Sequence, residues 1–176
     1  MPSVLESIMF VALLAIVVMF GATFLYHLFF APPFVPTPAA VVDEMIRQAR
    51  LAEGRVVYDL GAGDARFLIE AKRACPGVLA RGSESATLVW LLGKLRIALA
   101  GVPIDWRCCS YNHQSVTDAD VIFLYLFPSA MAALEPRFDK ELKPGTRVIS
   151  HSFRFPTRKP VKEVEVGKRM VLVYEW

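Results

Sequence analysis

The N-terminal part of the chain is one long run of apolar residues. Residues 8–30 carry no side chain that is charged at neutral pH when His27 is neutral. A helix of that length spans about 35 Å, enough to cross a hydrocarbon core of about 30 Å. Backbone groups in lipid must be satisfied within the segment, so a helix is the expected state. The pattern predicts a transmembrane helix over residues 8–30, after a short flank at residues 1–7.

A cleaved signal peptide is the competing interpretation of this segment. The run has no basic residue before it, is longer than a signal sequence needs, and is followed by no clear cleavage site. A retained anchor is therefore favoured. Four prolines within residues 31–38 cannot continue a helix and predict a stiff linker. Thr37 and Pro38 are then expected to be the N-cap and first residue of an amphipathic helix over residues 39–51.

Beyond residue 55, short apolar runs alternate with segments of helical periodicity. The pattern predicts strands at residues 56–60, 78–83, 104–108, 120–126 and 147–150, helices at 65–74, 85–100 and 129–142, and a terminal hairpin from 161–166 and 170–174. Such alternation predicts one α/β domain over residues 39–176, with a parallel sheet covered by helices on both faces. Ligands of such sheets bind at the carboxyl ends of the strands.

Composition narrows the class of protein only slightly. Hydrophobic residues make up 55% of the 176 residues, which excludes intrinsic disorder. The net charge of +3 is too mild to indicate nucleic-acid binding, and no nucleic-acid partner is expected. The three cysteines form neither a C-x-x-C pair nor an even disulfide set, so a reducing compartment and no metal site are expected.

The predicted strand at residues 56–60 runs into a turn that contains two glycines, Gly61 and Gly63. Glycine lets the backbone turn sharply and approach a ligand closely. A dinucleotide fingerprint would need a third glycine where Arg66 stands, and a P-loop would need G-K-[ST]. Two carboxylates beside the turn, Asp59 and Asp64, would repel a pyrophosphate. The turn therefore favours a cationic ligand that carries an amine.

The stretch D-L-G-A-G-D resembles the first motif of the class I S-adenosylmethionine (SAM)-dependent methyltransferases. The resemblance implies a Rossmann-like class I methyltransferase sheet and S-adenosyl-L-methionine as the cofactor. It also implies that Glu84, at the end of the second strand, accepts hydrogen bonds from both ribose hydroxyls. Asn112 stands in the loop that normally offers an acidic residue to the adenine amine. The implied cofactor-binding residues are Asp59, Gly61, Ala62, Gly63, Asp64, Glu84 and Asn112.

A narrower resemblance covers nearly the whole chain. Residues 33–38 and 142–156 resemble a small family of membrane-anchored protein lysine methyltransferases. Its mitochondrial members modify the ATP synthase c subunit and the adenine nucleotide translocase. The resemblance implies methyl transfer to a lysine of a membrane protein. Tyr125, after the fourth strand, and His151, after the fifth, are the candidate catalytic residues. A core or rim tyrosine is an equally good interpretation of Tyr125, and a hydrogen-bonded structural histidine is the favoured interpretation of His151.

Two other functions stay open on the sequence alone. A membrane tether would also serve methylation of a lipid or a quinone-like small molecule. Ala65, Ser83 and the missing adenine-loop carboxylate would suit a non-catalytic subunit of a membrane complex. Because SAM is made in the cytosol, we expect a single-pass membrane protein whose domain faces the cytoplasm. Besides the lipid around the single span, anionic headgroups are expected to contact a basic cluster formed by Arg154, Arg158, Lys159 and Lys162.

Overall fold

The computed structural model describes the backbone of residues 4–30 and 35–176, and the side chains of residues 4–21 and 35–176. The chain divides into two compact units, residues 1–35 and 36–176. The first contains helix α1 (Val4–Phe30), whose stretch Val4–Gly21 is long and apolar enough to cross a membrane. Its position in a bilayer stays a prediction. The side chain of His27 and residues 31–34 of the expected linker lie outside the described residues.

The second unit is built on one seven-stranded sheet with the order β3-β2-β1-β4-β5-β7-β6. The first five strands run parallel, and the last two form a hairpin antiparallel to β5. The strands are β1 (Val56–Leu60), β2 (Leu79–Glu84), β3 (Asp105–Cys108), β4 (Val121–Leu124), β5 (Arg147–His151), β6 (Lys162–Val166) and β7 (Arg169–Glu175). This order puts β1 and β4 at the centre, where the chain reverses direction across the sheet and ligands bind.

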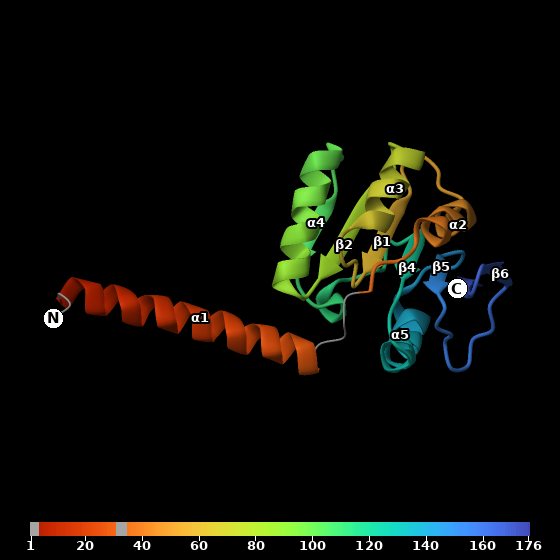
Figure 1. Ribbon diagram of the computed structural model, residues 1–176. Coiled ribbons are helices and arrows are strands. Elements are labelled where there is room, and N and C mark those ends of the chain that lie inside the picture. The colour runs from red at the N-terminus through yellow and green to blue at the C-terminus, as the bar shows by residue number, and fades with distance from the viewer. Residues whose placement is uncertain (1–3, 31–34) are drawn as a thin grey trace. The chain divides into compact units, whose positions relative to one another are not determined.

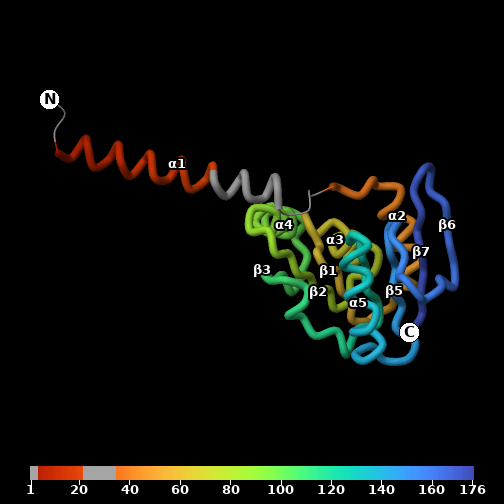
Figure 2. The backbone as a smooth tube through the Cα atoms, turned by 90° about the horizontal axis from the view of Figure 1, so that it is seen from below, coloured from red at the N-terminus to blue at the C-terminus, as the bar shows by residue number. Residues whose placement is uncertain are grey.

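Helices cover both faces of the sheet, as predicted. Helices α2 (Ala39–Ala49), α3 (Arg66–Ala74) and α4 (Thr87–Ala100) lie on one face, and α5 (Pro128–Glu141) lies on the other (Figures 1 and 2). Alternate residues of β1 therefore enter different cores. Val57 packs with α2 and α3, whereas Tyr58 and Leu60 pack with α5.

The Rossmann-like prediction is confirmed, and every predicted strand and helix of this unit is present with ends shifted by a few residues. One local prediction is wrong. Pro38, not Thr37, is the N-cap of α2, and its carbonyl accepts from the amides of Val41 and Val42. The Thr37 side chain does not cap the helix, because it is buried against the end of β5.

Candidate active site

The turn after β1 is a left-handed bend tied to the end of the neighbouring strand. Gly61 and Gly63 have φ values of +71° and +57°. The amides of Gly61 and Ala62 donate to the Ser83 carbonyl at 3.0 and 2.9 Å. A Cβ on Gly61 would lie 2.8 Å from Leu126 Cδ2, so another residue here would be strained by the positive φ angle and would have to displace the Leu126 side chain.

Glu84 closes the bend from the end of β2. Its Oε2 accepts from the Gly63 amide at 3.0 Å, and its Oε1 accepts from the Ala86 amide at 2.8 Å. Both oxygens are therefore held where the bend and the start of α4 meet. This position suits the predicted contact with ribose hydroxyls, which stays a prediction.

Asp59 is a buried carboxylate facing the same bend. It is 2% exposed, and its Oδ2 has no hydrogen-bond partner among the described residues. Burial raises its pKa well above the ordinary value, and the negative charges of Glu84 and Asp64 raise it further. A buried, unpartnered carboxylate is costly, and a cationic ligand would relieve that cost. These residues therefore fit the positively charged SAM.

Asp64 differs from Asp59 because its charge is already balanced. Arg66 donates to both of its oxygens at 2.8 and 2.7 Å, and Arg96 of α4 forms a second ion pair with it. Burial alone would raise the pKa of Asp64, but the bonds and charges of the two arginines outweigh it and the pKa is lowered. Asp64 thus ties the bend to α4, and contact between its carboxylate and the cofactor stays a prediction.

Asn112 lies in a short 3₁₀ turn after β3, Tyr111–His113. Its amide donates to Ser110 Oγ at 3.3 Å, and its side chain is exposed to solvent. The predicted contact between Asn112 and the adenine stays a prediction. Ala62 is buried in the bend, where its amide bonds β2.

The two candidate catalytic residues stack on each other beside the bend. Tyr125 directly follows β4 and His151 ends β5, and their ring centroids are 3.9 Å apart. The stack extends to Phe153, whose ring lies 6.0 Å from Tyr125, and on to Phe127 at 5.9 Å from Phe153. Leu126, between Tyr125 and Phe127 in the chain, is the side chain that a Cβ on Gly61 would meet. The aromatic cluster therefore adjoins the cofactor bend.

His151 lies beneath Tyr125 and is fully buried. Its Nδ1 is 3.3 Å from Thr37 Oγ1, and its Nε2 has no partner in the described part of the chain. Burial, and then the charge of Arg169, lowers its pKa to about 4, so the ring is neutral at physiological pH. His151 is thus a buried, neutral ring that packs against Tyr125, and a catalytic role of either residue stays a prediction.

Sequence reasoning missed two residues of this cluster, Thr37 and Arg169. Arg169 Nη1 donates to the Tyr125 hydroxyl at 3.2 Å from the terminal hairpin. Thr37 bonds His151 through its hydroxyl and Arg66 through its carbonyl. The prolines on both sides of Thr37 indicate a restricted backbone, but they do not indicate which residue the Thr37 side chain contacts.

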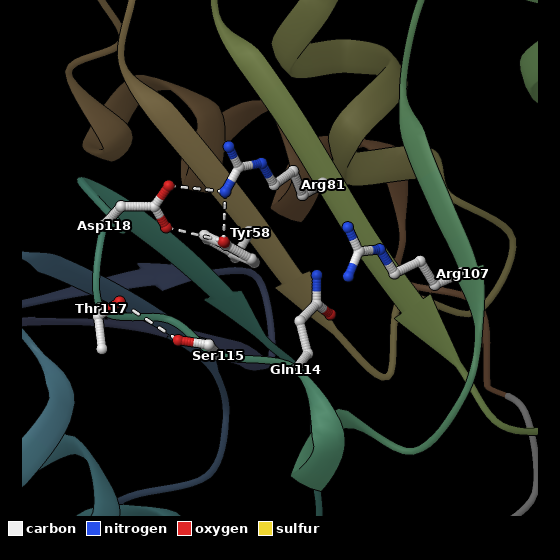
Figure 3. Close-up of a pocket in the computed structure, with 7 residues that line it drawn as sticks. All are labelled: Tyr58, Arg81, Arg107, Gln114, Ser115, Thr117 and Asp118. Carbon is white, nitrogen blue, oxygen red and sulfur yellow. Dashed lines mark hydrogen bonds and ion pairs between the residues drawn. The ribbon is translucent and has the colours of Figure 1, made fainter.

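A separate hollow of about 350 Å³ opens on the sheet face that α5 shares (Figure 3). Within it, Tyr58 Oη donates to Asp118 Oδ1 at 2.8 Å, and Arg81 Nη1 donates to both groups. None of the predicted cofactor residues lines this hollow. It is therefore distinct from the bend.

Most of the chain is similar in sequence to known methyltransferases. The family model described as the ANTKMT methyltransferase domain matches residues 59–162. A protein-lysine N-methyltransferase of Saccharolobus islandicus (strain REY15A) is 34% identical, over 81% of this chain and 91% of its own length. The Mus musculus adenine nucleotide translocase lysine N-methyltransferase is 31% identical, over 81% of this chain and 62% of its own. The Mus musculus lysine N-methyltransferase for the c subunit of ATP synthase is 33% identical, over 81% and 58%. The chain thus spans less than two thirds of both mouse proteins.

Solved structures show the same fold. An RNA methyltransferase from Salinibacter ruber in complex with S-adenosyl-L-homocysteine superposes with a TM-score of 0.77 at 34% identity, covering 80% of this chain and 93% of that chain. A precorrin-6y C5,15-methyltransferase from Geobacter metallireducens GS-15 gives a TM-score of 0.64 at 15% identity, covering 82% and 92%, and supports the fold alone.

Proposed function

The chain belongs to the ANTKMT methyltransferase family and is a SAM-dependent methyltransferase, and from this premise we propose that it methylates a lysine side chain of a membrane protein. Three relatives are named as lysine methyltransferases, two of them for the adenine nucleotide translocase and the c subunit of ATP synthase. The apolar helix α1 supports an acceptor in the membrane. Membership in an enzyme family removes the reason to favour a non-catalytic subunit.

The residues around the bend would hold the cofactor. When bound, SAM supplies both the methyl group and its own leaving group. Asp59 would provide the negative charge for the cation, Glu84 would orient the ribose, and the bend at Gly61 and Gly63 would let the backbone approach closely. The task left to the protein is to align donor and acceptor and to exclude water.

The observation that carries the acceptor proposal is the aromatic cluster beside the bend. Tyr125, Phe127, Phe153 and His151 form a continuous stack at the carboxyl ends of β4 and β5. Aromatic faces attract alkylammonium groups and their methylated forms, and apolar rings keep water away from a lysine amine. An amide or nucleobase acceptor would instead need polar side chains after β4 to form hydrogen bonds with it. This chain has the apolar residues Leu126 and Phe127 there.

A lysine acceptor must lose its proton before it can react. Arg169 places a fixed positive charge beside Tyr125, where it donates to the phenol oxygen at 3.2 Å. A neighbouring cation and an apolar wall both lower the pKa of an ammonium group. The ring of His151 is neutral at physiological pH and adds no charge that would stabilise the lysine ammonium. The site would therefore favour the neutral amine, while Tyr125 Oη accepts a hydrogen bond from it.

Labelled methyl transfer tests the acceptor class directly. The purified full chain would be incubated with methyl-labelled SAM and membranes of a strain that lacks the gene, then fractionated into protein, lipid and RNA. We expect label in protein, released by hydrolysis as methyl-lysine, and none with Asp59→Asn. Label in the lipid extract would support the small-molecule alternative. Label in RNA, in line with the name of the Salinibacter protein, would overturn the lysine proposal.

The proposed topology has one membrane span with residues 39–176 in the cytoplasm. The cytosolic origin of SAM supports this orientation, and the apolar length of α1 supports the span. A reporter fused after Trp176 should be active in its cytoplasmic form. Activity of a periplasmic reporter alone would overturn the orientation without affecting the chemistry.

A further inference from the structure

Helix α4 presents an apolar stripe to solvent. Its five leucines are between 44% and 79% exposed: Leu88, Leu91, Leu92, Leu95 and Leu99. At 3.6 residues per turn they share a sector of about 100° on one side of the helix. By contrast, α3 offers solvent a charged pair, Glu70 and Arg73, joined at 2.6 Å. An apolar outer face of this length indicates that something covers it.

The inner face of α4 is already occupied by the domain's own core. A Cβ on Gly93 would overlap the Trp106 ring and lie 3.3 Å from the Gly63 carbonyl, so the helix packs closely on β3 and the bend. Trp106 Nε1 also donates to the Trp90 carbonyl at 3.0 Å. The exposed leucines of α4 therefore take no part in packing the core of the domain.

The charges on α4 match an anionic surface. Lys94 and Arg96 flank the stripe on opposite sides, and no acidic residue occurs in the 14 residues of the helix. Lys94 Nζ lies 5.1 Å above the Trp90 ring, an arrangement common at lipid headgroups. Arg96 is paired with Asp64, just as Arg154 and Arg158 of the basic cluster are paired with Glu163 and Asp139. Lys94 forms no ion pair with any residue that the structure describes, so it is the α4 cation left for an anionic surface.

We infer that α4 docks on the surface of an anionic bilayer, with its leucines in the acyl boundary and Lys94 among the headgroups. The inference rests on the proposed membrane substrate and deepens it. The apolar α1 belongs to the same chain, and a linker of eight residues reaches about 30 Å at most, so a bilayer that holds α1 is within reach of the domain.

Docking through α4 fixes which lysines the site can reach. Glu84 lies just before the start of α4, and Arg96 bonds Asp64 of the bend. A helix that lies flat on the lipid is about 10–12 Å thick, so the bend residues that touch its inner face stay close to the lipid surface. The acceptor class is therefore a lysine at the membrane–water boundary, rather than one on a distant soluble domain.

Depth-dependent quenching tests the docking in the full chain. Cys75, Cys108 and Cys109 are replaced by serine, and an environment-sensitive dye is attached at Leu95→Cys or, as the matched comparison, at Glu165→Cys. Glu165 is exposed on β6, at the opposite edge of the sheet from α4. Both proteins are placed in vesicles of equal parts phosphatidylcholine and phosphatidylglycerol, with quenchers on the acyl chains. A SAM-binding measurement on each sample checks the fold.

The expected result is a blue shift and strong loss of emission at residue 95, with little change at residue 165. Adding Leu91→Gln to a chain labelled at Leu88→Cys should lower the docked population about tenfold, whereas Val161→Gln, also an exposed apolar site, should not.

A blue shift without acyl-chain quenching would mean that protein covers the stripe and would overturn the inference. Quenching at residue 165 instead would assign docking to the basic cluster. None of these readouts needs an acceptor, so they are independent of the lysine assignment.

Discussion

The hydroxyl of Thr37 lies 3.3 Å from Nδ1 of His151, and joins the segment before α2 to the end of β5. The carbonyl of the same residue accepts from Arg66, which begins α3 directly after the glycine bend. Arg66 in turn bonds Asp64. One buried threonine therefore contacts both Arg66 at the glycine bend, which we propose to hold the cofactor, and His151 of the aromatic cluster, which we propose to meet the acceptor.

Thr37→Val should lower both stability and activity. The substitution keeps the shape but leaves Nδ1 of His151 buried without a partner, at a cost of about 1–3 kcal/mol in the free energy of unfolding. Thr37→Ser keeps the hydroxyl and should retain most of the stability. Urea unfolding of both variants, with methylation rates measured in parallel, checks this. Equal stability of the valine and serine variants would show that the bond contributes nothing.

His151 should make the fold sensitive to acid. Its pKa is lowered to about 4 in the native state, by burial and then by Arg169, whereas an unfolded histidine titrates near 6.5. The unfolded chain therefore binds a proton first, and stability falls as the pH drops from about 6.5 to about 4, by roughly 3 kcal/mol. Below that range the histidine contributes no further loss.

His151→Phe should remove this part of the pH dependence while it keeps a ring against Tyr125. The free energy of unfolding of both proteins would be measured across the acid range. As the pH falls, the wild type should lose stability relative to the variant, by roughly 3 kcal/mol between pH 6.5 and pH 4. A constant difference would mean that His151 does not titrate in this way.

Asp59→Asn should stabilise the ligand-free protein at neutral pH and abolish SAM binding. The pKa of Asp59 is raised, by burial first and then by Glu84 and Asp64, so the native state holds a proton that the unfolded state has lost. Ionised Asp59 therefore lowers stability as the pH rises through its native pKa. A neutral amide avoids this cost but cannot pair with a cation.

Thermal shift with and without SAM measures both effects in one experiment. The wild-type protein should gain stability from SAM, and the Asp59→Asn variant should not. Asp118→Asn is the matched control, since Asp118 lies in the separate hollow (Figure 3) and should leave the SAM-induced shift unchanged. Because SAM binding needs the carboxylate, affinity in the wild type should also rise with pH. An unchanged SAM-induced shift in Asp59→Asn would remove Asp59 from the cofactor site.

The sequence predicted what depends on local pattern. Alternating apolar runs were enough for the sheet, and D-L-G-A-G-D was enough for the bend, because positive φ angles and glycine are linked by sterics. Relationships between distant residues were out of reach. Arg96 neutralises Asp64 from 32 positions away, and Thr37 turns from its expected capping role to His151, since tertiary burial outweighs a local capping preference. The outward orientation of the α4 leucines was also out of reach, because periodicity cannot tell which face of a helix is covered.

Arg169→Gln should move the pH dependence of methylation. Arg169 donates to the Tyr125 hydroxyl at 3.2 Å, and its charge beside the acceptor lowers the pKa of an entering lysine ammonium. Without that charge the bound lysine holds its proton to higher pH, so the rising limb of kcat against pH, which reports ionisations in the enzyme–substrate complex, should shift upward. Arg169→Lys keeps the charge and should restore the wild-type limb even where its rate is lower. The measurement is kcat at saturating SAM and saturating acceptor across the alkaline range. A limb that stays in place while the rate falls would show that Arg169 only orients the tyrosine, and the source of lysine deprotonation would then have to be the apolar wall formed by Phe127 and Phe153.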